Sequence, residues 1–254
     1  MVMADVDGVL RDTKSSVPAV TREQIEKFHA RGGIFGMITA APFEHIPEIP
    51  AHILCAESGA VCQLPERDGL QIFEPGRLAI AELKQCLGIE VDNGLARLCG
   101  QPVIVEGPRK ASLTLLSGKP PHYPDLSVPS LSEELMGELE KAIQEHELDL
   151  HVSCASDTTY AWVDIVSVTK ARTMEVQVEL LGKGIFFLGD GEHDFWAMKV
   201  PGVIPVGFSN SIPKIQELAD KTGVLINLRG PDGGAAEFFR RLNEGEIPQH
   251  LFPS

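Results

Sequence analysis

The sequence predicts an α/β protein in which a parallel sheet flanked by helices carries a smaller, inserted α+β unit. Two observations favour this class. Short apolar runs alternate with amphipathic stretches in the first and last thirds of the 254-residue chain, as in parallel strands joined by helices. The middle third does not alternate in this way, because its pattern is helix, two strands, helix, two strands.

The first third begins with a predicted strand, Val2–Val6. A helix follows, for which Thr21 is the predicted N-cap and Gln24 completes a capping box. The glycine pair at 32–33 ends this helix. The apolar run Ile34–Ile38 is then predicted as a buried strand.

The last third repeats the alternation of strand and helix. The predicted strands are Ile185–Leu188, Val203–Val206 and Val224–Ile226, and the predicted helices are Asp194–Lys199, Pro213–Lys221 and Gly234–Asn243. Alternation of this kind is typical of parallel strands, because each crossover needs a helix to return the chain to the same edge.

The middle third predicts the inserted unit. Its predicted helices are Arg77–Leu87 and Leu131–Glu147, and its predicted strands are Pro102–Glu106, Ala111–Leu116, Leu148–Cys154 and Thr159–Val166. We therefore expect two domains. Residues 1–75 and 166–254 form the α/β domain, and residues 76–165 form the inserted domain.

Composition excludes several classes of function. The formal net charge is −14 with no Lys/Arg-rich stretch, so neither nucleic acid nor an anionic membrane is an expected partner. No apolar run reaches the roughly 18 residues of a membrane-spanning helix, and the acidic amino terminus is unlike a signal peptide, so we expect a cytoplasmic location. The five cysteines include no CxxC pair, which argues against a structural zinc site. The oligomeric state is left open.

Asp5 and Asp7 form the most specific motif, Asp5-Val6-Asp7-Gly8-Val9-Leu10, at the end of the first strand. Alternation along an extended chain places both carboxylates on the same side. One can attack phosphorus while the other exchanges a proton with the leaving oxygen. A strand that simply ends in an Asp-Gly turn would have the same pattern.

Asp190 and Asp194 belong to a second motif, Gly189-Asp190-Gly191-Glu192-His193-Asp194, which follows a predicted strand. Two carboxylates at this spacing can hold Mg²⁺ through oxygen ligands. A turn followed by an N-capping acid would give the same spacing. An HD-type metal hydrolase would also contain the His-Asp pair, but the other histidines lack the spacing that such a site requires.

Two further polar residues follow predicted strands. Thr39 comes directly after the strand Ile34–Ile38, and Lys170 comes after the strand that closes the inserted unit. Ligands bind at the carboxyl ends of the strands in open α/β sheets. We therefore expect Thr39 and Lys170 to converge with the two acidic motifs at one edge of the sheet.

Taken in this order, the segments resemble the four motifs of the haloacid dehalogenase (HAD) superfamily of phosphatases. The Asp5–Leu10 segment resembles the first motif, in which the first Asp is the nucleophile and the second is the general acid and base. Met37-Ile38-Thr39, Lys170 and Gly189–Asp194 resemble the second, third and fourth motifs. The resemblance covers roughly residues 1–75 and 166–254 and implies a Rossmann-like core.

The resemblance also implies a set of site residues. Mg²⁺ would be bound by Asp5, by the main-chain carbonyl of Asp7 and by Asp190, with Asp194 binding the metal or lying just behind its ligands. Thr39 and Lys170 would hold the phosphoryl group. The segment 206–210 resembles a later one in which an Asn, here Asn210, helps to hold phosphate.

Three positions depart from the usual motifs of the superfamily. Val9 stands where Thr is commonest, and His193 stands where Asn is usual. Ala40-Ala41 stands where many relatives have Gly-Arg, so the Arg that contacts substrate in those relatives has no counterpart here. None of these changes removes a required carboxylate or the lysine.

The inserted unit resembles a cap domain. Residues 8–38 are too few to hold a cap, so the insertion lies between Thr39 and Lys170 instead. Its order of elements is similar to the caps of sucrose-phosphate, mannosyl-3-phosphoglycerate, trehalose-phosphate and phosphoglycolate phosphatases, which close over the site and supply specificity. Candidate residues for reading a sugar or a second anion lie in its loops: Arg109, Lys110, Lys119, His122 and Tyr123.

The sequence therefore predicts a Mg²⁺-dependent phosphomonoester hydrolase that forms an aspartyl-phosphate. Its expected substrate is a small phosphorylated metabolite, either a sugar phosphate or a compound like phosphoglycerate or phosphoglycolate. One alternative is a phosphohexomutase like phosphomannomutase, against which the short fourth motif argues. The other is a catalytically silent binding or regulatory protein on the same fold.

Overall fold

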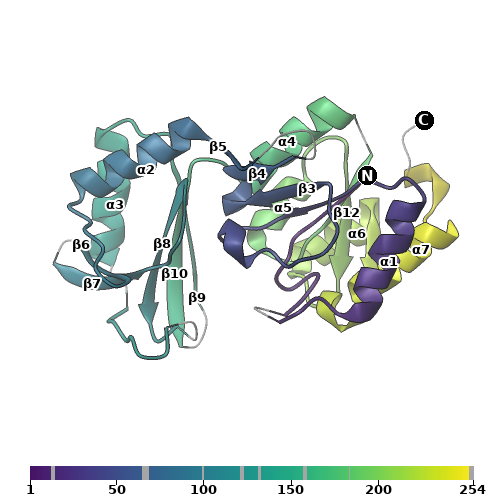
Figure 1. Cartoon of the computed structure of the whole chain (residues 1–254), viewed down its shortest axis with the longest axis horizontal. Coiled ribbons are helices and arrows are strands. Elements are labelled where there is room, and N and C mark those ends of the chain that lie inside the picture. Colours follow the sequence, from purple (N-terminus) through teal and green to yellow (C-terminus); the bar gives the residue numbers. More distant parts are fainter. Residues whose placement is uncertain are drawn as a thin grey trace. The chain divides into compact units, whose positions relative to one another are not determined.

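The chain divides into two compact units. The computed structural model describes residues 1–12, 15–64, 69–98, 100–120, 123–130, 133–156, 159–182 and 184–251. Unit 1 comprises Met1–Gln71 and Thr169–Ser254, and unit 2 comprises Ile72–Val168 (Figure 1). The sequence places the corresponding borders at 75/76 and 165/166.

Unit 1 is built on a sheet with the strand order β13-β12-β11-β1-β2-β3-β4-β5. The neighbours from β13 to β3 pair in parallel, and β4 runs antiparallel to β3. This confirms the predicted α/β class. The strands are β1 (Val2–Ala4), β2 (Phe35–Ile38), β3 (Ile53–Ala56), β4 (Val61–Gln63), β5 (Gln71–Ile72), β11 (Ile185–Leu188), β12 (Val203–Phe208) and β13 (Val224–Ile226).

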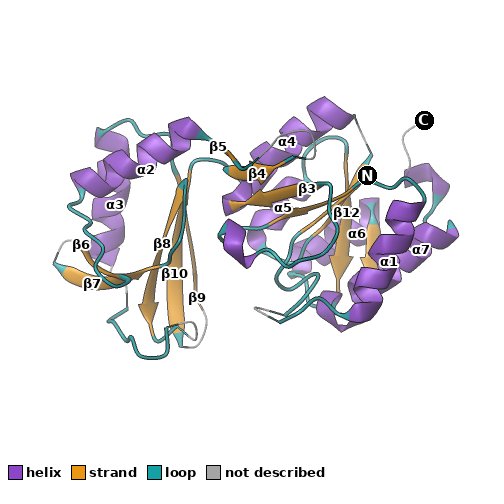
Figure 2. Ribbon diagram, viewed as in Figure 1, coloured by secondary structure: helices purple, strands orange, loops and turns teal. Residues whose placement is uncertain are grey.

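Helices cover both faces of this sheet (Figure 2). One face packs against α1 and α7, and the other packs against α4, α5 and α6. Burial on both faces explains why the central strands are almost entirely apolar. The helices are α1 (Ala19–Ala30), α4 (Lys170–Leu181), α5 (Glu192–Met198), α6 (Pro213–Thr222) and α7 (Ala235–Glu244).

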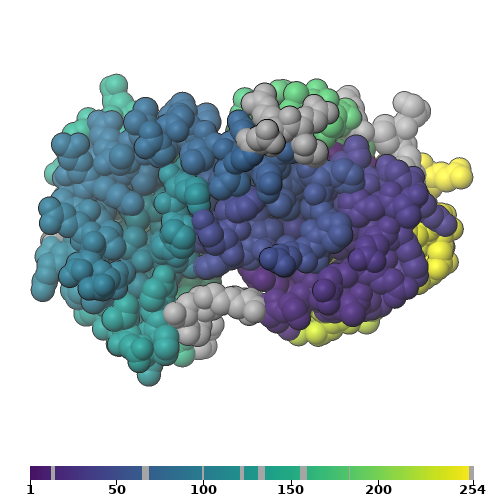
Figure 3. Space-filling view, in the orientation of Figure 1, coloured from purple at the N-terminus to yellow at the C-terminus, as the bar shows by residue number. Residues whose placement is uncertain are grey.

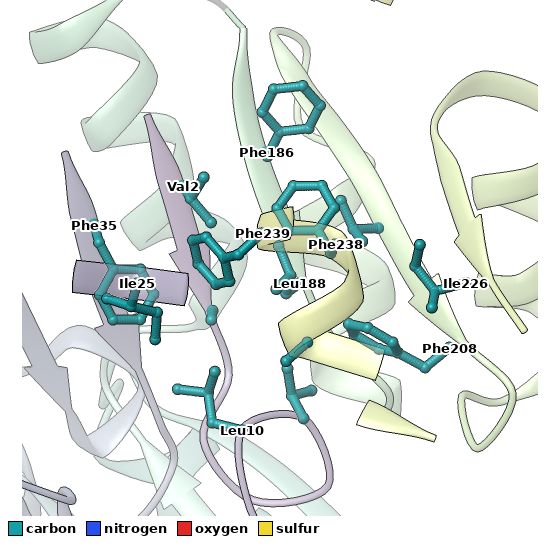
Figure 4. Close-up of a cluster of buried hydrophobic side chains, with 14 of the residues drawn as sticks. Val2, Leu10, Ile25, Phe35, Phe186, Leu188, Phe208, Ile226, Phe238 and Phe239 are labelled. Carbon is teal, nitrogen blue, oxygen red and sulfur yellow. The ribbon is translucent and has the colours of Figure 1, made fainter. Parts of the chain in front are cut away.

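Aromatic side chains dominate the core on the α1–α7 face. Phe238 and Phe239 of α7 point toward the sheet, where Phe35 of β2 and Phe186 of β11 meet them (Figure 4). All four are essentially buried. In the space-filling view, the N-terminal part of the chain forms most of the visible surface of unit 1, and the C-terminal part lies at its edge (Figure 3). Helices α1 and α7, from the first and last parts of the chain, thus cover the same face of the sheet.

The start of α1 differs from the prediction. Thr21 lies buried within the helix and is not its N-cap, which is Pro18. Proline fixes its own φ, and the backbone N–H of Thr21 already donates to the Pro18 carbonyl at 3.0 Å. The helix therefore begins three residues earlier than the capping pattern predicted.

In its described residues, unit 2 contains a five-stranded antiparallel sheet of order β6-β7-β8-β10-β9 and two helices. The strand β6 was not predicted, because its short run follows a turn and alternates buried and exposed residues over only four positions. The elements are α2 (Glu74–Cys86), β6 (Leu95–Leu98), β7 (Gln101–Val105), β8 (Ser112–Gly118), α3 (Glu133–Glu145), β9 (His151–Ser156) and β10 (Tyr160–Val166).

The two helices of unit 2 cover one face of its sheet. Leu83 of α2 and Leu139 of α3 share a buried cluster with strand residues such as Leu115 and Val163. The opposite face carries a second, smaller cluster that includes Ile104, Leu116 and Val128. No helix in the described part of the chain is both long enough and apolar enough to cross a membrane.

Candidate active site

The predicted site residues of the first, second and fourth motifs follow three neighbouring strands of unit 1. In the parallel register, Ala4 of β1 lies opposite Met37 of β2 and Leu188 of β11. Asp5 therefore lies directly beyond the last paired residue of β1. Its N–H donates to the Leu188 carbonyl at 2.9 Å. Since the strands are parallel, their carboxyl ends share one edge, as the sequence predicted.

Lys170 joins the first and fourth motifs. Its Nζ lies 2.9 Å from Asp5 Oδ1 and 2.7 Å from Asp194 Oδ1, and its side chain is only 4% exposed. Lys170 is the first residue of α4, whose N-cap Thr169 accepts a hydrogen bond from the Arg172 N–H. Burial alone would lower the pKa of Lys170, but the two carboxylates raise it, so the ammonium stays charged.

Asp194 is held at both carboxylate oxygens. Oδ1 accepts from Lys170, and Oδ2 accepts from the backbone N–H groups of Asp190 and Gly191 at 3.0 Å each. Burial would raise the pKa of Asp194, but the Lys170 charge and these hydrogen bonds outweigh it and lower the pKa. Asp194 therefore remains an anion that fixes the loop carrying Asp190.

The other two carboxylates have raised pKa values. Burial is the largest cause for Asp5, followed by the negative charge of Asp194, and Lys170 offsets them in part. Burial and Asp194 together raise the pKa of Asp190 to about 7. Three carboxylates thus share a single ammonium, and the excess negative charge adds to the effect of burial in raising the two pKa values.

These three carboxylates form a cluster suited to a cation. Asp5, Asp190 and Asp194 each offer an oxygen, and the three oxygens lie within 4.8 Å of one another. Carboxylate oxygens are the ligands that hard cations such as Mg²⁺ prefer. The donor set and its uncompensated charge therefore fit a divalent cation.

Asp5 Oδ1 is fully engaged by the protein. It accepts from the Val6 N–H at 2.8 Å and from Lys170 at 2.9 Å. No described residue forms a hydrogen bond to the other oxygen, Oδ2. The arrangement orients the carboxylate and leaves Oδ2 as the oxygen able to react.

Asn210 lies beside Asp190 and makes three hydrogen bonds within unit 1. Its Nδ2 donates to the Gly8 carbonyl at 2.8 Å and to Asp190 Oδ2 at 3.1 Å, and its Oδ1 accepts from the Gly230 N–H at 2.9 Å. Both amide hydrogens thus have acceptors in the protein, whereas the sequence predicted a phosphate contact. Asn210 links the first motif to the fourth.

Gly8 makes this close approach possible. Its φ of +81° lies in the region that favours glycine, and a Cβ there would lie 2.1 Å from Asp190 Oδ2. Position 8 therefore requires glycine for two reasons: its backbone conformation has a positive φ, and the neighbouring Asp190 carboxylate leaves no room for a Cβ.

Thr39 is buried after β2. Its N–H donates to the Cys55 carbonyl at 2.9 Å, and its Oγ1 accepts from the Ala41 N–H at 3.1 Å. The carbonyl of Thr39 in turn accepts from the Ser58 N–H at 2.8 Å. The strand β3, which the sequence analysis did not predict, thus holds Thr39 in place.

Asp7 has a partner that the sequence analysis missed. Arg11 donates from Nε to Asp7 Oδ1 at 3.0 Å, and its side chain is only 10% exposed. The available signal was the spacing of four residues between a carboxylate and a guanidinium. On a helix, residues four apart are neighbours, but in a turn this spacing does not by itself place two side chains together. The sequence therefore did not predict the pair.

The candidate specificity residues lie in unit 2. Arg109 forms an ion pair with Glu106 and donates to Ser112 Oγ at 3.2 Å. These side chains line a cavity of about 460 Å³ together with Lys84, Asn93 and Tyr123. Lys110 is half-buried and Lys119 is exposed. His122, the remaining candidate, lies outside the described residues.

No protein-family model and no curated protein matches the sequence. Solved structures do match. A haloacid dehalogenase-like hydrolase from Bacteroides thetaiotaomicron superposes with a TM-score of 0.63 at 14% identity, covering 95% of this chain and 98% of that one.

Two further solved structures have related descriptions. A HAD-superfamily phosphatase from Bacteroides thetaiotaomicron gives a TM-score of 0.56 at 17% identity over 94% of this chain and 93% of that chain. A sugar phosphatase of HAD subclass IIB gives 0.55 at 16% identity over 95% and 98%. Near-complete coverage of both chains means that the likeness includes both units, and the chain therefore has the fold of the haloacid dehalogenase-like hydrolases.

Proposed function

We propose that the chain is a phosphomonoester hydrolase of the HAD superfamily that requires Mg²⁺ and acts on a small phosphorylated metabolite. The observation that carries this proposal is the Lys170 ammonium, buried between Asp5 and Asp194 with Asp190 alongside. These four residues come from three separate motifs and meet at the carboxyl edge of the sheet, where ligands bind in open α/β sheets. A site with only a structural role is not expected to gather three carboxylates around one ammonium, because uncompensated buried charge destabilises the fold.

Mg²⁺ would be held by Asp5, Asp190 and the main-chain carbonyl of Asp7. When bound, the metal would supply positive charge that offsets repulsion between the nucleophile and the phosphate. The oxygens of Asp194 already accept three hydrogen bonds, so we assign it to positioning Lys170 and the Asp190 loop.

The proposed reaction uses Asp5 and Asp7 in two steps. Asp5 Oδ2 attacks phosphorus, the bond to the leaving oxygen breaks, and that oxygen takes a proton from Asp7. Water then gives a proton to Asp7 and attacks the aspartyl-phosphate, which releases phosphate and regenerates Asp5. Lys170 and Thr39 would stabilise the phosphoryl oxygens.

We assign Asn210 a positioning role in place of the predicted phosphate contact. Its amide spans the Gly8 carbonyl and Asp190 Oδ2, and both hydrogens are used. It would fix the distance between the first motif and the metal ligand of the fourth. A displacement of a reacting group by about 1 Å can lower the rate by about 10²-fold.

The metabolite would be a sugar phosphate or a compound like phosphoglycerate or phosphoglycolate. Unit 2 would act as the specificity domain, since it contains none of the four motifs. Its cavity combines charged and hydroxyl-bearing side chains with the apolar Val91, Val105 and Leu113, so it offers contacts for both the polar groups and the carbon skeleton of such a metabolite.

An assay of the purified chain against a panel of phosphorylated metabolites tests the proposal. We expect Mg²⁺-dependent phosphate release that chelation abolishes, and essentially none from Asp5→Asn. Asp190→Ala should raise the Mg²⁺ concentration needed for half-maximal activity sharply, whereas the exposed Asp220→Ala should not. Full turnover after thorough chelation would contradict the metal requirement. Isomerisation of hexose phosphates would indicate a mutase, and binding without turnover would indicate a silent protein.

A further inference from the structure

Arg11 is a buried cation that belongs to none of the four motifs. Its three guanidinium nitrogens each have an acceptor: Nε bonds Asp7 Oδ1 at 3.0 Å, Nη2 bonds the His45 carbonyl at 2.7 Å, and Nη1 lies 3.4 Å from the Ser15 carbonyl. Arginine in a turn ordinarily keeps its charge in water. Its burial here therefore points to a specific task.

The hydrogen bonds connect two segments that border the site. Arg11 closes the turn of the first motif, in which the Gly8 N–H donates to the Arg11 carbonyl at 2.8 Å. His45 ends the short 3₁₀ helix Phe43–His45, which follows β2 and Thr39. Arg11 thus ties the Asp7 side chain to the backbone that follows the second motif.

The arrangement leaves one carboxylate oxygen of Asp7 available. Oδ1 accepts from Arg11, and no described residue forms a hydrogen bond to Oδ2. A short carboxylate side chain that is fixed at one oxygen can present the other in a single direction. Without Arg11 it would rotate among several rotamers.

Given the function proposed above, we infer that Arg11 is a positioning residue that aims Asp7 Oδ2 at the leaving oxygen. The proton on Oδ2 passes to that oxygen as its bond to phosphorus breaks, and the phosphoryl group moves to Asp5. In the second step, Oδ2 takes a proton from the water that attacks phosphorus, and the bond to Asp5 breaks. Arg11 itself exchanges no proton.

Direct binding of the substrate anion by Arg11 fits the structure less well. Each nitrogen already has an acceptor, which leaves at most one N–H on each of Nη1 and Nη2, and the side chain is 10% exposed. An anion-binding arginine would present free N–H groups in a fork to the ligand. The same observations therefore favour action through Asp7.

The test compares two esters that differ in their need for an acid. p-Nitrophenyl phosphate has a leaving group that departs without protonation, whereas an alkyl phosphate hydrolysed by the wild type has one that needs a proton. Arg11→Gln should lower kcat/KM for the alkyl ester by about 10²-fold, and much less for the aryl ester. kcat/KM is the quantity of choice because it reports steps up to aspartyl-phosphate formation.

Three further variants separate positioning from a general loss of structure. Arg11→Lys keeps the charge but not the fork, so its alkyl-to-aryl ratio should fall between the wild type and Arg11→Gln. In an Asp7→Asn background, Arg11→Gln should leave the ratio unchanged, because the group it aims is gone. Arg229→Gln is the control, since this exposed guanidinium pairs with Asp12 and Asp232 and does not contact Asp7.

An equal fall for both esters in an active, folded Arg11→Gln enzyme would overturn the inference and leave the proposed function intact. So would unchanged kcat/KM values for both esters or a rise in alkyl-ester activity. A further change of the alkyl-to-aryl ratio in the Asp7→Asn background would also overturn it. A wild type that hydrolyses neither ester nor any metabolite would overturn both proposals together. Thermal melting of each variant shows whether the fold is retained.

Discussion

At the scale of single residues, the main feature of the site is that it has fewer cationic side chains than carboxylates. Lys170 is shared by Asp5 and Asp194, while Asp190 faces the Asn210 amide. The raised pKa values of Asp5 and Asp190 follow from burial and from this imbalance. The arrangement is costly for an empty protein and suited to one that binds a divalent cation.

Gly8→Ala should impair the site by steric conflict. A Cβ at position 8 would lie 2.1 Å from Asp190 Oδ2, so the carboxylate or the turn must move. We expect activity to fall by about 10²-fold or more, together with a higher Mg²⁺ requirement. Titration of activity against Mg²⁺ measures both effects.

The control for Gly8→Ala is Gly245→Ala. Gly245 also has a positive φ, +75°, but a Cβ there would meet nothing within 4 Å. Both variants carry backbone strain of about 1 kcal/mol, and only the first meets a carboxylate of the proposed active site. Equal losses of activity in the two variants would show that strain alone, and not the contact with Asp190, is responsible.

At the scale of elements, the predictable parts are those with an apolar period. The strands β11 and β13 match their predicted bounds because their residues are apolar on both faces. Helix α4 was not predicted, because three of its four buried residues are polar: Lys170, Thr173 and Gln177. Its buried face serves the site and the loop after β3, where Thr173 Oγ1 donates to the Ser58 carbonyl at 2.8 Å.

The same reasoning separates the site residues that the sequence could place from those it could not. Asp5, Thr39 and Asp190 follow strands, so parallel topology alone brings them to one edge. Arg11 and the bonds of Asn210 depend on the path of turns, which apolar periodicity does not specify. These two residues were therefore missed or assigned a different contact.

Helix α7 offers a prediction about pH. Glu237 in its first turn pairs with Arg240 and Arg241, and these hydrogen bonds lower its pKa from 4.5 to about 2. A lowered pKa means that the carboxylate stabilises the fold above about pH 4.5 and that this stabilisation is lost as the pH falls toward 2. Glu237→Gln should cost at most about 1 kcal/mol near pH 7, because the pairs are partly exposed.

Thermal melting at pH 7 and near pH 3 measures this effect. The melting temperature of Glu237→Gln should lie below that of the wild type at pH 7, and the difference should shrink at the lower pH. Glu217→Gln, which removes an exposed pair with Lys221, should cost less. A difference that stays constant with pH would rule out the carboxylate charge as the cause.

At the scale of the whole molecule, chemistry and specificity are expected to reside in different units. Each proposed catalytic residue lies in unit 1, and the cavity lined by Arg109 lies in unit 2. Sequence reasoning predicted the insertion because its order of elements breaks the strand–helix alternation. It could not predict β6, since four residues carry too little periodic signal.

Substitution of Arg109 should change preference among substrates while preserving the chemistry. Arg109→Gln should alter relative kcat/KM values for a panel of phosphorylated metabolites, with hydrolysis of p-nitrophenyl phosphate close to that of the wild type. The double variant Glu106→Gln/Arg109→Gln removes both charges and so avoids leaving one of them unpaired. The control is Arg77→Gln, an exposed arginine of α2 in the same unit.

Loss of p-nitrophenyl phosphate hydrolysis in the double variant, with both units still folded, would contradict this division of labour. Unchanged preferences in every Arg109 variant would show that other residues of unit 2 read the substrate.

The position of β1 also determines when the site can form during synthesis. In the sheet, β1 lies between β2 and β11, and all of unit 2 is encoded between these two neighbours. At about 5–20 residues per second, a ribosome adds β11 roughly 10–40 s after β1. For that interval one edge of the buried segment Val2–Ala4 has no strand to pair with. The proposed nucleophile Asp5 is thus translated well before Asp190 and Asp194, which complete the carboxylate cluster around it.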